Sequence, residues 1–138
     1  MANSSGTAGW SGSSGAVVEV RVPATVAFVS TLRLTAASLA ARCDLTVDDI
    51  EDLRLAVDEA CALLLPHAAE PSTLDARFRL AQGELSVDTS VRSVQSASPD
   101  RNGFGWTVLG ALASSVDVTR DGERLSIRVT KQREAGGR

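Results

Sequence analysis

The chain alternates between segments whose apolar residues recur at every second position and segments whose apolar residues recur at every third or fourth. The first spacing is typical of a half-buried strand, and the second places apolar side chains on one face of a helix. The strand-like segments are Ala16–Val22, Thr73–Leu80, Leu85–Val91, Ser115–Thr119 and Leu125–Thr130. The helix-like segments are Thr25–Arg42, Asp48–His67 and Phe104–Ser114.

Turn and cap residues separate these segments. Thr46 is a suitable N-cap for the second helix, and Pro66 marks the end of that helix or a kink in it. Gln82–Gly83 and Asp121–Gly122 each join two strand-like segments, which indicates two hairpins. The order β-α-α-β-β-α-β-β predicts an α+β fold, a two-layer sandwich in which three helices cover one face of a mixed, mainly antiparallel sheet.

Length and composition limit what the chain can be. Its 138 residues suit one domain, which we expect over residues 16–132, between a flexible Ser- and Gly-rich tail (1–15) and a frayed C-terminus (133–138). A net charge of −3 argues against a protein that binds nucleic acid directly. No apolar run approaches the ~20 residues of a membrane span, and the tail lacks the pattern of a signal peptide. The sequence therefore predicts a cytoplasmic protein.

The second helix carries the first candidate for chemistry. Glu59 and Leu63 lie one helical turn apart on the same face, and a carboxylate there could act as a general base if it faced a nucleotide. The alternative is an ordinary solvated carboxylate. His67 is more simply explained as a cap or surface residue than as a catalyst, and Cys43 and Cys61 lack the spacing of metal ligands, so we predict no metal site made by the protein alone.

The second candidate is the sequence Asn102-Gly-Phe-Gly-Trp106 at the start of the third helix. Glycines at Gly103 and Gly105 let backbone N–H groups approach a phosphate, and the N-terminus of a helix favours negative charge. A simple turn before a helix explains the same residues.

Together these residues resemble a known family. The stretch "VDDIEDLRLAVDEACALLLPHA" is similar to the N-box helix of the bacterial anti-sigma factors that double as serine-protein kinases, members of the GHKL (Bergerat-fold, histidine kinase-like) ATPases. "GFGWTVLGALASSVDV" and "IRVTK" resemble the segments that close the domain in this family, and Pro23 followed by Leu32-Arg33 resembles its opening helix. The resemblance covers roughly Val17–Lys131.

The resemblance implies specific roles for five residues. Glu59 would be the catalytic base, Gly103, Gly105 and Thr130 would contact ATP, with Thr130 near the adenine, and Arg33 would contact partner proteins. It also implies a homodimer, ATP and Mg²⁺ as cofactors, and two protein partners, an alternative sigma factor and an anti-anti-sigma factor.

Three departures from the family pattern affect the nucleotide site. Leu63 stands where the family has the Asn that holds magnesium, although Mg²⁺ requires oxygen ligands. The family's D-x-G-x-G motif is absent from Val87–Asn102, its Asp falling near Val91 and its first Gly near Ser93. The loss of two such anchors weakens nucleotide affinity by roughly a hundredfold or more.

Three hypotheses follow. In the first, the protein sequesters a stress- or sporulation-type sigma factor, and an anti-anti-sigma factor releases that sigma factor by competing for the same surface, in a partner switch. In the second, it is an ATP-dependent kinase that phosphorylates a serine of the anti-anti-sigma factor, with Glu59 as base. In the third, it is another α+β regulator, such as a degenerate histidine-kinase module. The broken nucleotide motifs favour the first hypothesis.

Overall fold

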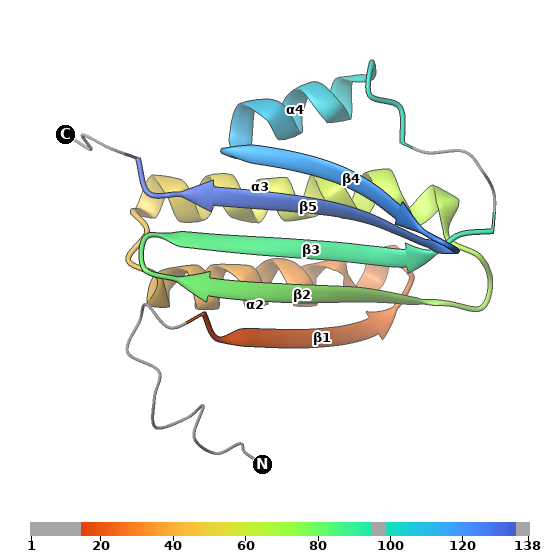
Figure 1. Ribbon diagram of the computed structural model, residues 1–138, viewed down its shortest axis with the longest axis horizontal. Coiled ribbons are helices and arrows are strands. Elements are labelled where there is room, and N and C mark those ends of the chain that lie inside the picture. Colours follow the sequence, from red (N-terminus) through yellow and green to blue (C-terminus); the bar gives the residue numbers. More distant parts are fainter. Residues whose placement is uncertain (1–14, 95–98, 135–138) are drawn as a thin grey trace, which may run out of the picture.

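The computed structural model describes residues 15–94 and 99–134, so residues 1–14 of the predicted tail lie outside the described residues (Figure 1). The five strands are β1 (Val17–Pro23), β2 (Thr73–Ala81), β3 (Glu84–Arg92), β4 (Ser115–Asp121) and β5 (Arg124–Gln132). The helices are α2 (Val29–Arg42), α3 (Val47–Leu64) and α4 (Phe104–Leu112), with short 3₁₀ turns at Val26–Phe28 and Leu65–His67.

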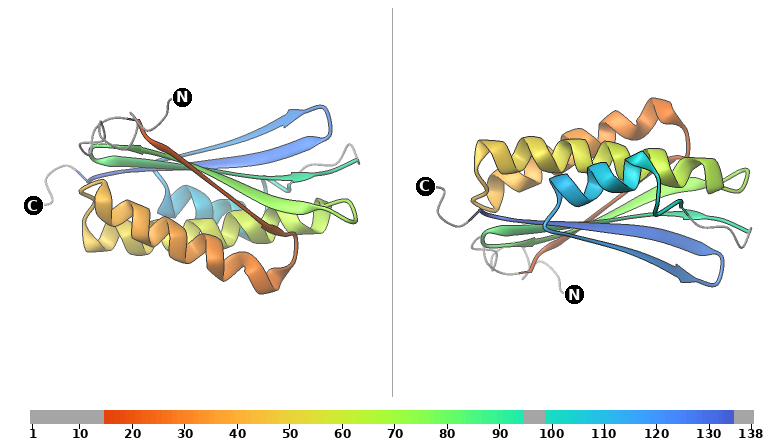
Figure 2. Two further views of the ribbon diagram at one scale, coloured as in Figure 1. Left: turned by 90° about the horizontal axis from the view of Figure 1, so that it is seen from below. Right: turned by 90° about the horizontal axis from the view of Figure 1, so that it is seen from above.

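The predicted α+β sandwich is confirmed, because all three α-helices lie on the same face of one five-stranded sheet (Figure 2). The sheet order is β1-β2-β3-β5-β4, and each of its four neighbouring pairs is antiparallel. We predicted a mixed, mainly antiparallel sheet, whereas within the described residues no two neighbouring strands are parallel. The helix α4 does connect two strands of the same direction, β3 and β4, but β5 is inserted between them and pairs antiparallel with both.

The start of α3 is fixed by a capping box. The Thr46 hydroxyl accepts from the Asp49 N–H, and the Asp49 carboxylate accepts from the Thr46 N–H, both at 3.1 Å. Burial raises the pKa of Asp49, but the hydrogen bonds from Thr46 outweigh it and hold that pKa below the ordinary 3.8. At the other end the α-helix stops at Leu64, and Pro66 lies in the 3₁₀ turn that follows.

The hydrophobic core fills the space between the helices and the sheet. Its largest side chain, Phe78 on β2, is fully buried together with aliphatic residues from every layer (Leu32, Leu53, Leu64, Leu85, Leu109 and Ile127). This packing fixes which side of α3 faces the sheet, and so leaves the Glu59 side of the helix toward α4.

The start of the predicted frayed segment makes contacts with the domain. Arg133, expected in the frayed segment, donates its backbone N–H to Gly83 O at 2.8 Å and its guanidinium to Asp44. These contacts attach the end of β5 to the β2–β3 turn and to the α2–α3 loop. None of the helices within the described ranges is long and apolar enough to cross a membrane.

Candidate functional site

The structure brings together three of the residues that the sequence singled out. Glu59 and Leu63 on α3 face the first turn of α4, where Gly105 packs directly against them. A side-chain carbon at position 105 would overlap the Glu59 carboxylate and lie 3.1 Å from Leu63 Cδ2. A side chain at position 105 would therefore displace the Glu59 carboxylate and crowd Leu63.

The N-terminus of α4 has an internal anion close to it. Gly103 is the N-cap of the helix. Because it has no side chain, no hydroxyl or carboxylate at this position caps the N–H groups of the first turn. The Asp100 carboxylate accepts from Asn102 N–H at 2.8 Å, and its other oxygen would be 3.2 Å from a side-chain carbon placed on Gly103. A phosphate approaching these glycines would meet this negative charge. Sequence reasoning missed Asp100, although an aspartate two residues before a backbone donor is a common turn signal.

The positions of the missing D-x-G-x-G motif have structural roles instead. Val91 is part of the hydrophobic core and is almost fully buried. Ser93 is buried as well, where its hydroxyl and its carbonyl both accept from Arg120 and its N–H donates to Glu123 O. No carboxylate stands at either of these two positions.

The structure does not bring Thr130 to the other candidates. On β5 the residues Leu125, Ile127 and Val129 face the helices, so Thr130 points to the opposite face of the sheet. There its hydroxyl is 2.7 Å from the Ser86 hydroxyl. Thr130 and Glu59 therefore lie on opposite sides of the β-sheet, and contact of Thr130 with a nucleotide stays a prediction without geometric support.

Arg33, the predicted partner contact, is held by an ion pair between α2 and α3. Its Nη1 lies 2.9 and 3.1 Å from the two carboxylate oxygens of Asp58, and both side chains are about one-third exposed. The pair uses Nη1 of Arg33 and leaves part of the guanidinium exposed.

Lys131 is a buried cation that sequence reasoning did not identify. Its side chain is 6% exposed, and its Nζ lies 3.2 Å from Asp52 Oδ2 on α3 and 2.9 Å from Leu112 O at the end of α4. Lys131 thus links β5 to α3, which carries Glu59, and to α4, which packs against α3. The alternation of Leu125, Ile127 and Val129 could have revealed it, because the next residue in that series is Lys131.

Two further groups in α3 contribute no chemistry. Burial, with a smaller effect from Asp58, raises the pKa of the Cys61 thiol to about 12, so this cysteine stays protonated and unreactive. In residues 15–94 and 99–134, no group of three or more His, Cys, Asp or Glu side chains could hold a metal ion.

The two glycines of α4 give a matched test of the packing at Glu59. Gly110 has open space around it, so Gly110→Ala should raise the free energy of unfolding by about 0.5–1 kcal/mol. Gly105→Ala should lower it by up to about 1 kcal/mol, because Glu59 must turn away and Leu63 must give way. Urea denaturation followed by circular dichroism measures both values. Equal gains in the two variants would contradict the close contact of Gly105.

Comparisons with known proteins show what the chain as a whole resembles. A histidine kinase-like ATPase domain model matches residues 22–131. The chain is 27% identical to the serine-protein kinase RsbW of Bacillus cereus (strain B4264), covering 85% of this chain and 86% of that protein. It is 39% identical to RsbW of Halalkalibacterium halodurans over 71 residues, 51% of this chain and 44% of that protein.

A solved structure shows the same fold. The RsbU and RsbW domains of Rv1364c from Mycobacterium tuberculosis superpose with a TM-score of 0.66 at 18% identity, covering 85% of this chain and 32% of that chain.

Proposed function

Because the chain belongs to the family of histidine kinase-like ATPase domains, we propose that it acts as a cytoplasmic anti-sigma factor. It binds an alternative sigma factor of the stress or sporulation class and is antagonised by an anti-anti-sigma factor, in a partner switch. We include a homodimer in this proposal. Both relatives described above are named serine-protein kinase RsbW, which supports placing this chain with the serine-protein kinases of the family.

The observation that carries the proposal is a complete scaffold whose nucleotide-binding motifs are broken. The sheet and its three helices are all present, whereas Leu63 stands beside Glu59 where the family has its magnesium-binding Asn. A protein that sequesters a partner needs the scaffold and its surface. It does not need the phosphate and metal contacts on which phosphoryl transfer depends.

The residues of this chain do not fit ATP and Mg²⁺. Leu63 offers no oxygen to a metal, Asp100 places a negative charge beside the glycines, and Val91 is a core residue where the family has a carboxylate. We therefore assign no catalytic step to the nucleotide site.

The outer side of α2 supports a protein-binding role. Arg33 keeps part of its guanidinium exposed, and Leu34, the next residue, is 59% exposed. An arginine beside an exposed aliphatic side chain is a common core of a protein interface, because the stem packs and the guanidinium forms directed hydrogen bonds. We place the partner-binding surface on this side of α2.

The second candidate function is the ATP-dependent serine kinase that phosphorylates the anti-anti-sigma factor. One observation favours it, namely that Glu59 and Gly105, which the family uses for chemistry and phosphate binding, are both kept and lie in contact.

Two measurements on the full chain separate the candidates. We expect a pull-down with the sigma factors of the source organism to recover one of them, and an ATP titration by calorimetry, with and without magnesium, to give no heat at millimolar nucleotide. Recovery of no sigma factor would contradict the first function. Magnesium-dependent ATP binding, followed by transfer of phosphate to a partner serine that Glu59→Ala abolishes, would establish the second.

A further inference from the structure

The helix α4 has no polar side, although much of it is in contact with water. Its nine residues include no charged side chain, and Thr107 alone carries a hydroxyl. Among them only Leu109 is buried, while Trp106 and Leu112 pack in part against the core. A helix that is apolar all round is normally covered on every side. The outer side of α4 therefore has the composition of a covered surface but lacks a cover among the described residues.

The outward residues of α4 recur at helical spacing, on the side away from the core. Phe104 and Ala111 are exposed, and Val108 between them is partly exposed. Phe104 is 83% exposed, the largest fraction for any large hydrophobic residue that the structure describes. An aromatic side chain that a helix holds in water is typical of an anchor in a protein interface.

The helix α3 extends this apolar area, because α3 and α4 lie side by side and run in opposite directions (Figure 2). Gly105 at the start of α4 packs against Glu59 in the second half of α3. Lys131 links the end of α4 to the first half of α3. Leu55 lies one helical turn before Glu59 and is 51% exposed. We call the area formed by the following residues the α3–α4 surface: Leu55, Phe104, Val108 and Ala111.

Acidic side chains border the α3–α4 surface. The helix α3 carries six carboxylates and a single arginine, and three of these carboxylates pair with cations while a fourth belongs to the capping box. Within residues 15–94 and 99–134, Asp48 and Glu59 form no ion pair. Asp48 lies two turns before Leu55, and Glu59 lies one turn after it. Asp100, beside the N-terminus of α4, is a third carboxylate without an ion pair in the described residues.

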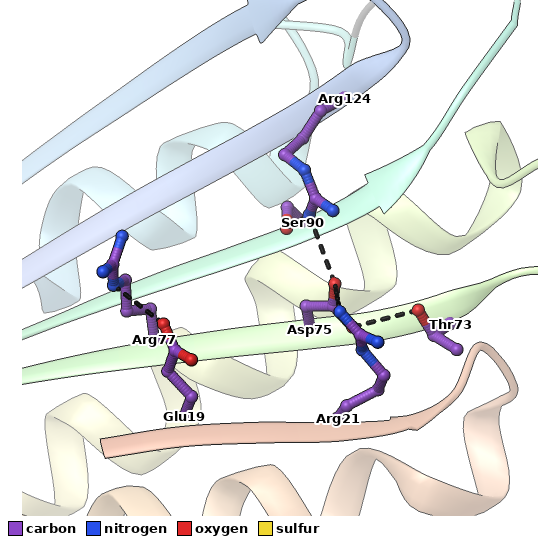
Figure 3. Close-up of polar contacts among 7 residues, drawn as sticks. All are labelled: Glu19, Arg21, Thr73, Asp75, Arg77, Ser90 and Arg124. Atoms are coloured by element: carbon purple, nitrogen blue, oxygen red, sulfur yellow. Dashed lines mark hydrogen bonds and ion pairs between the residues drawn. The ribbon is translucent and has the colours of Figure 1, made fainter. Parts of the chain in front are cut away.

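The charges on the sheet face opposite the helices are arranged differently. There the Asp75 carboxylate lies 3.0 Å from Arg21 Nε and 3.3 Å from Arg124 Nη1, and Arg77 Nε lies 3.2 Å from Glu19 Oε2 (Figure 3). These groups compensate one another across the strands. The three carboxylates around the α3–α4 surface have no such partners, so their charge is available to a second molecule.

We propose that the α3–α4 surface binds a basic amphipathic helix of a protein partner. The aliphatic side chains of that helix cover the exposed apolar residues of α3 and α4. Its lysine and arginine side chains face the three carboxylates that have no ion pair in this chain. This is the arrangement by which an amphipathic helix commonly binds along an apolar strip with a charged border.

The spacing and size of the α4 residues favour a helix as the occupant. Phe104, Val108 and Ala111 repeat about once per turn, which is the spacing at which a second helix places its own apolar side chains. Ala111 is small, and Gly110 has open space around it, so the backbone of a partner helix can approach the end of α4 closely.

Other occupants fit the α3–α4 surface less well. Nucleic acid and an anionic membrane would both be repelled by Asp48, Glu59 and Asp100. A second copy that presented the same surface would bring the same carboxylates to the border. An uncharged apolar segment would cover Phe104 but would leave the three carboxylates without cations. A basic helix satisfies both the apolar centre and the acidic border.

The α3–α4 surface is separate from the partner-binding side that we propose for α2. The helix α2 lies along the other flank of α3, where Arg33 pairs with Asp58 (Figure 2). The inference therefore goes beyond the proposed binding of a sigma factor and does not depend on it.

Fluorescence anisotropy with a labelled model peptide tests the proposal on the full chain. The peptide consists of leucine and lysine, has about 15 residues or about four helical turns, and carries leucine at every third or fourth position. At physiological salt we expect micromolar affinity. Phe104→Ser and Leu55→Ser should each weaken binding about tenfold, as the loss of an interface anchor does. Leu34→Ser changes a similarly exposed leucine on α2 and should have no effect.

The contribution of the charges is measured separately. The double variant Asp48→Asn with Glu59→Gln should weaken binding several-fold, and higher salt should weaken binding to the wild type. A peptide with glutamate in place of lysine should not bind. A peptide of the same composition in which leucine and lysine alternate should bind at least tenfold more weakly, because it cannot form an apolar helical side.

Several results would overturn the proposal. The first is no binding of the leucine–lysine helix at sub-millimolar concentration, and the second is equal binding of the alternating peptide. Equal affinity of the Phe104, Leu55 and Leu34 variants would place the peptide elsewhere on the chain. If Leu55→Ser unfolds the chain, Phe104→Ser alone gives the answer, because Phe104 is the more exposed residue. A negative sigma-factor pull-down leaves this inference untouched, and failure of the peptide to bind leaves the pull-down untouched.

Discussion

The variant Arg33→Asp is expected to bind its protein partner roughly thirtyfold more weakly than the wild type. A loss of this size is typical when an arginine that dominates the binding energy of an interface is removed. Arg33 lies on the side of α2 that we assign to the partner, and part of its guanidinium remains exposed. Isothermal titration with the sigma factor recovered in the pull-down measures the loss.

The ion pair with Asp58 provides the control for this experiment. Arg33→Asp alone also breaks the pair between α2 and α3, which is 2.9 Å long, and so lowers stability. The exchange Arg33→Asp with Asp58→Arg restores an ion pair between the helices but keeps the reversed charge at position 33. We expect its melting temperature to return close to that of the wild type while partner affinity stays low. Recovery of affinity together with stability would show that Arg33 acts only on the fold.

The variant Lys131→Met is expected to lower the free energy of unfolding by about 2 kcal/mol. Methionine keeps the length of the buried stem but removes the donor shared by Asp52 and Leu112 O. The loss is smaller than for a fully buried ion pair, because the Asp52 side chain is 38% exposed and water recovers part of its solvation. Chemical denaturation followed by circular dichroism gives the value.

An exposed ion pair on the same sheet serves as the comparison. Arg92 on β3 pairs with Glu123 at 3.3 Å, and both side chains are about half exposed. Arg92→Met should cost less than about 1 kcal/mol, as exposed pairs do. If the two methionine variants were equally stable, the link from Lys131 to α3 and α4 would contribute no more than an ordinary surface contact.

The positions of helices and strands could be predicted because the spacing of apolar residues carries this information directly. The two-residue period marked all five strands, and the Thr46 cap marked the start of α3. The sheet order could not be predicted in the same way. The insertion of β5 between β3 and β4 depends on how the whole layer of helices packs, which no local pattern encodes.

The candidate site, like the fold, could be predicted from the sequence only in part. The structure places Gly105 against Glu59, two residues that the sequence singled out separately and whose contact no spacing along the chain describes. The family resemblance placed Thr130 near the adenine, whereas the alternation of β5 alone places it on the other face, beside Ser86. Asp100 was missed because its effect depends on the fold of a loop around the α4 N-terminus, which spacing does not describe.

The place of β5 in the sheet has a consequence for how the chain folds during synthesis. Since Arg124–Gln132 lies between β3 and β4, the strands made earlier leave β3 with an open edge and β4 without any partner until this late segment emerges. The nascent chain therefore exposes these unpaired backbone groups from the synthesis of β3 until that of β5, a state prone to mispairing with other chains. Truncation within β5 would remove an interior strand of the sheet rather than trim its border.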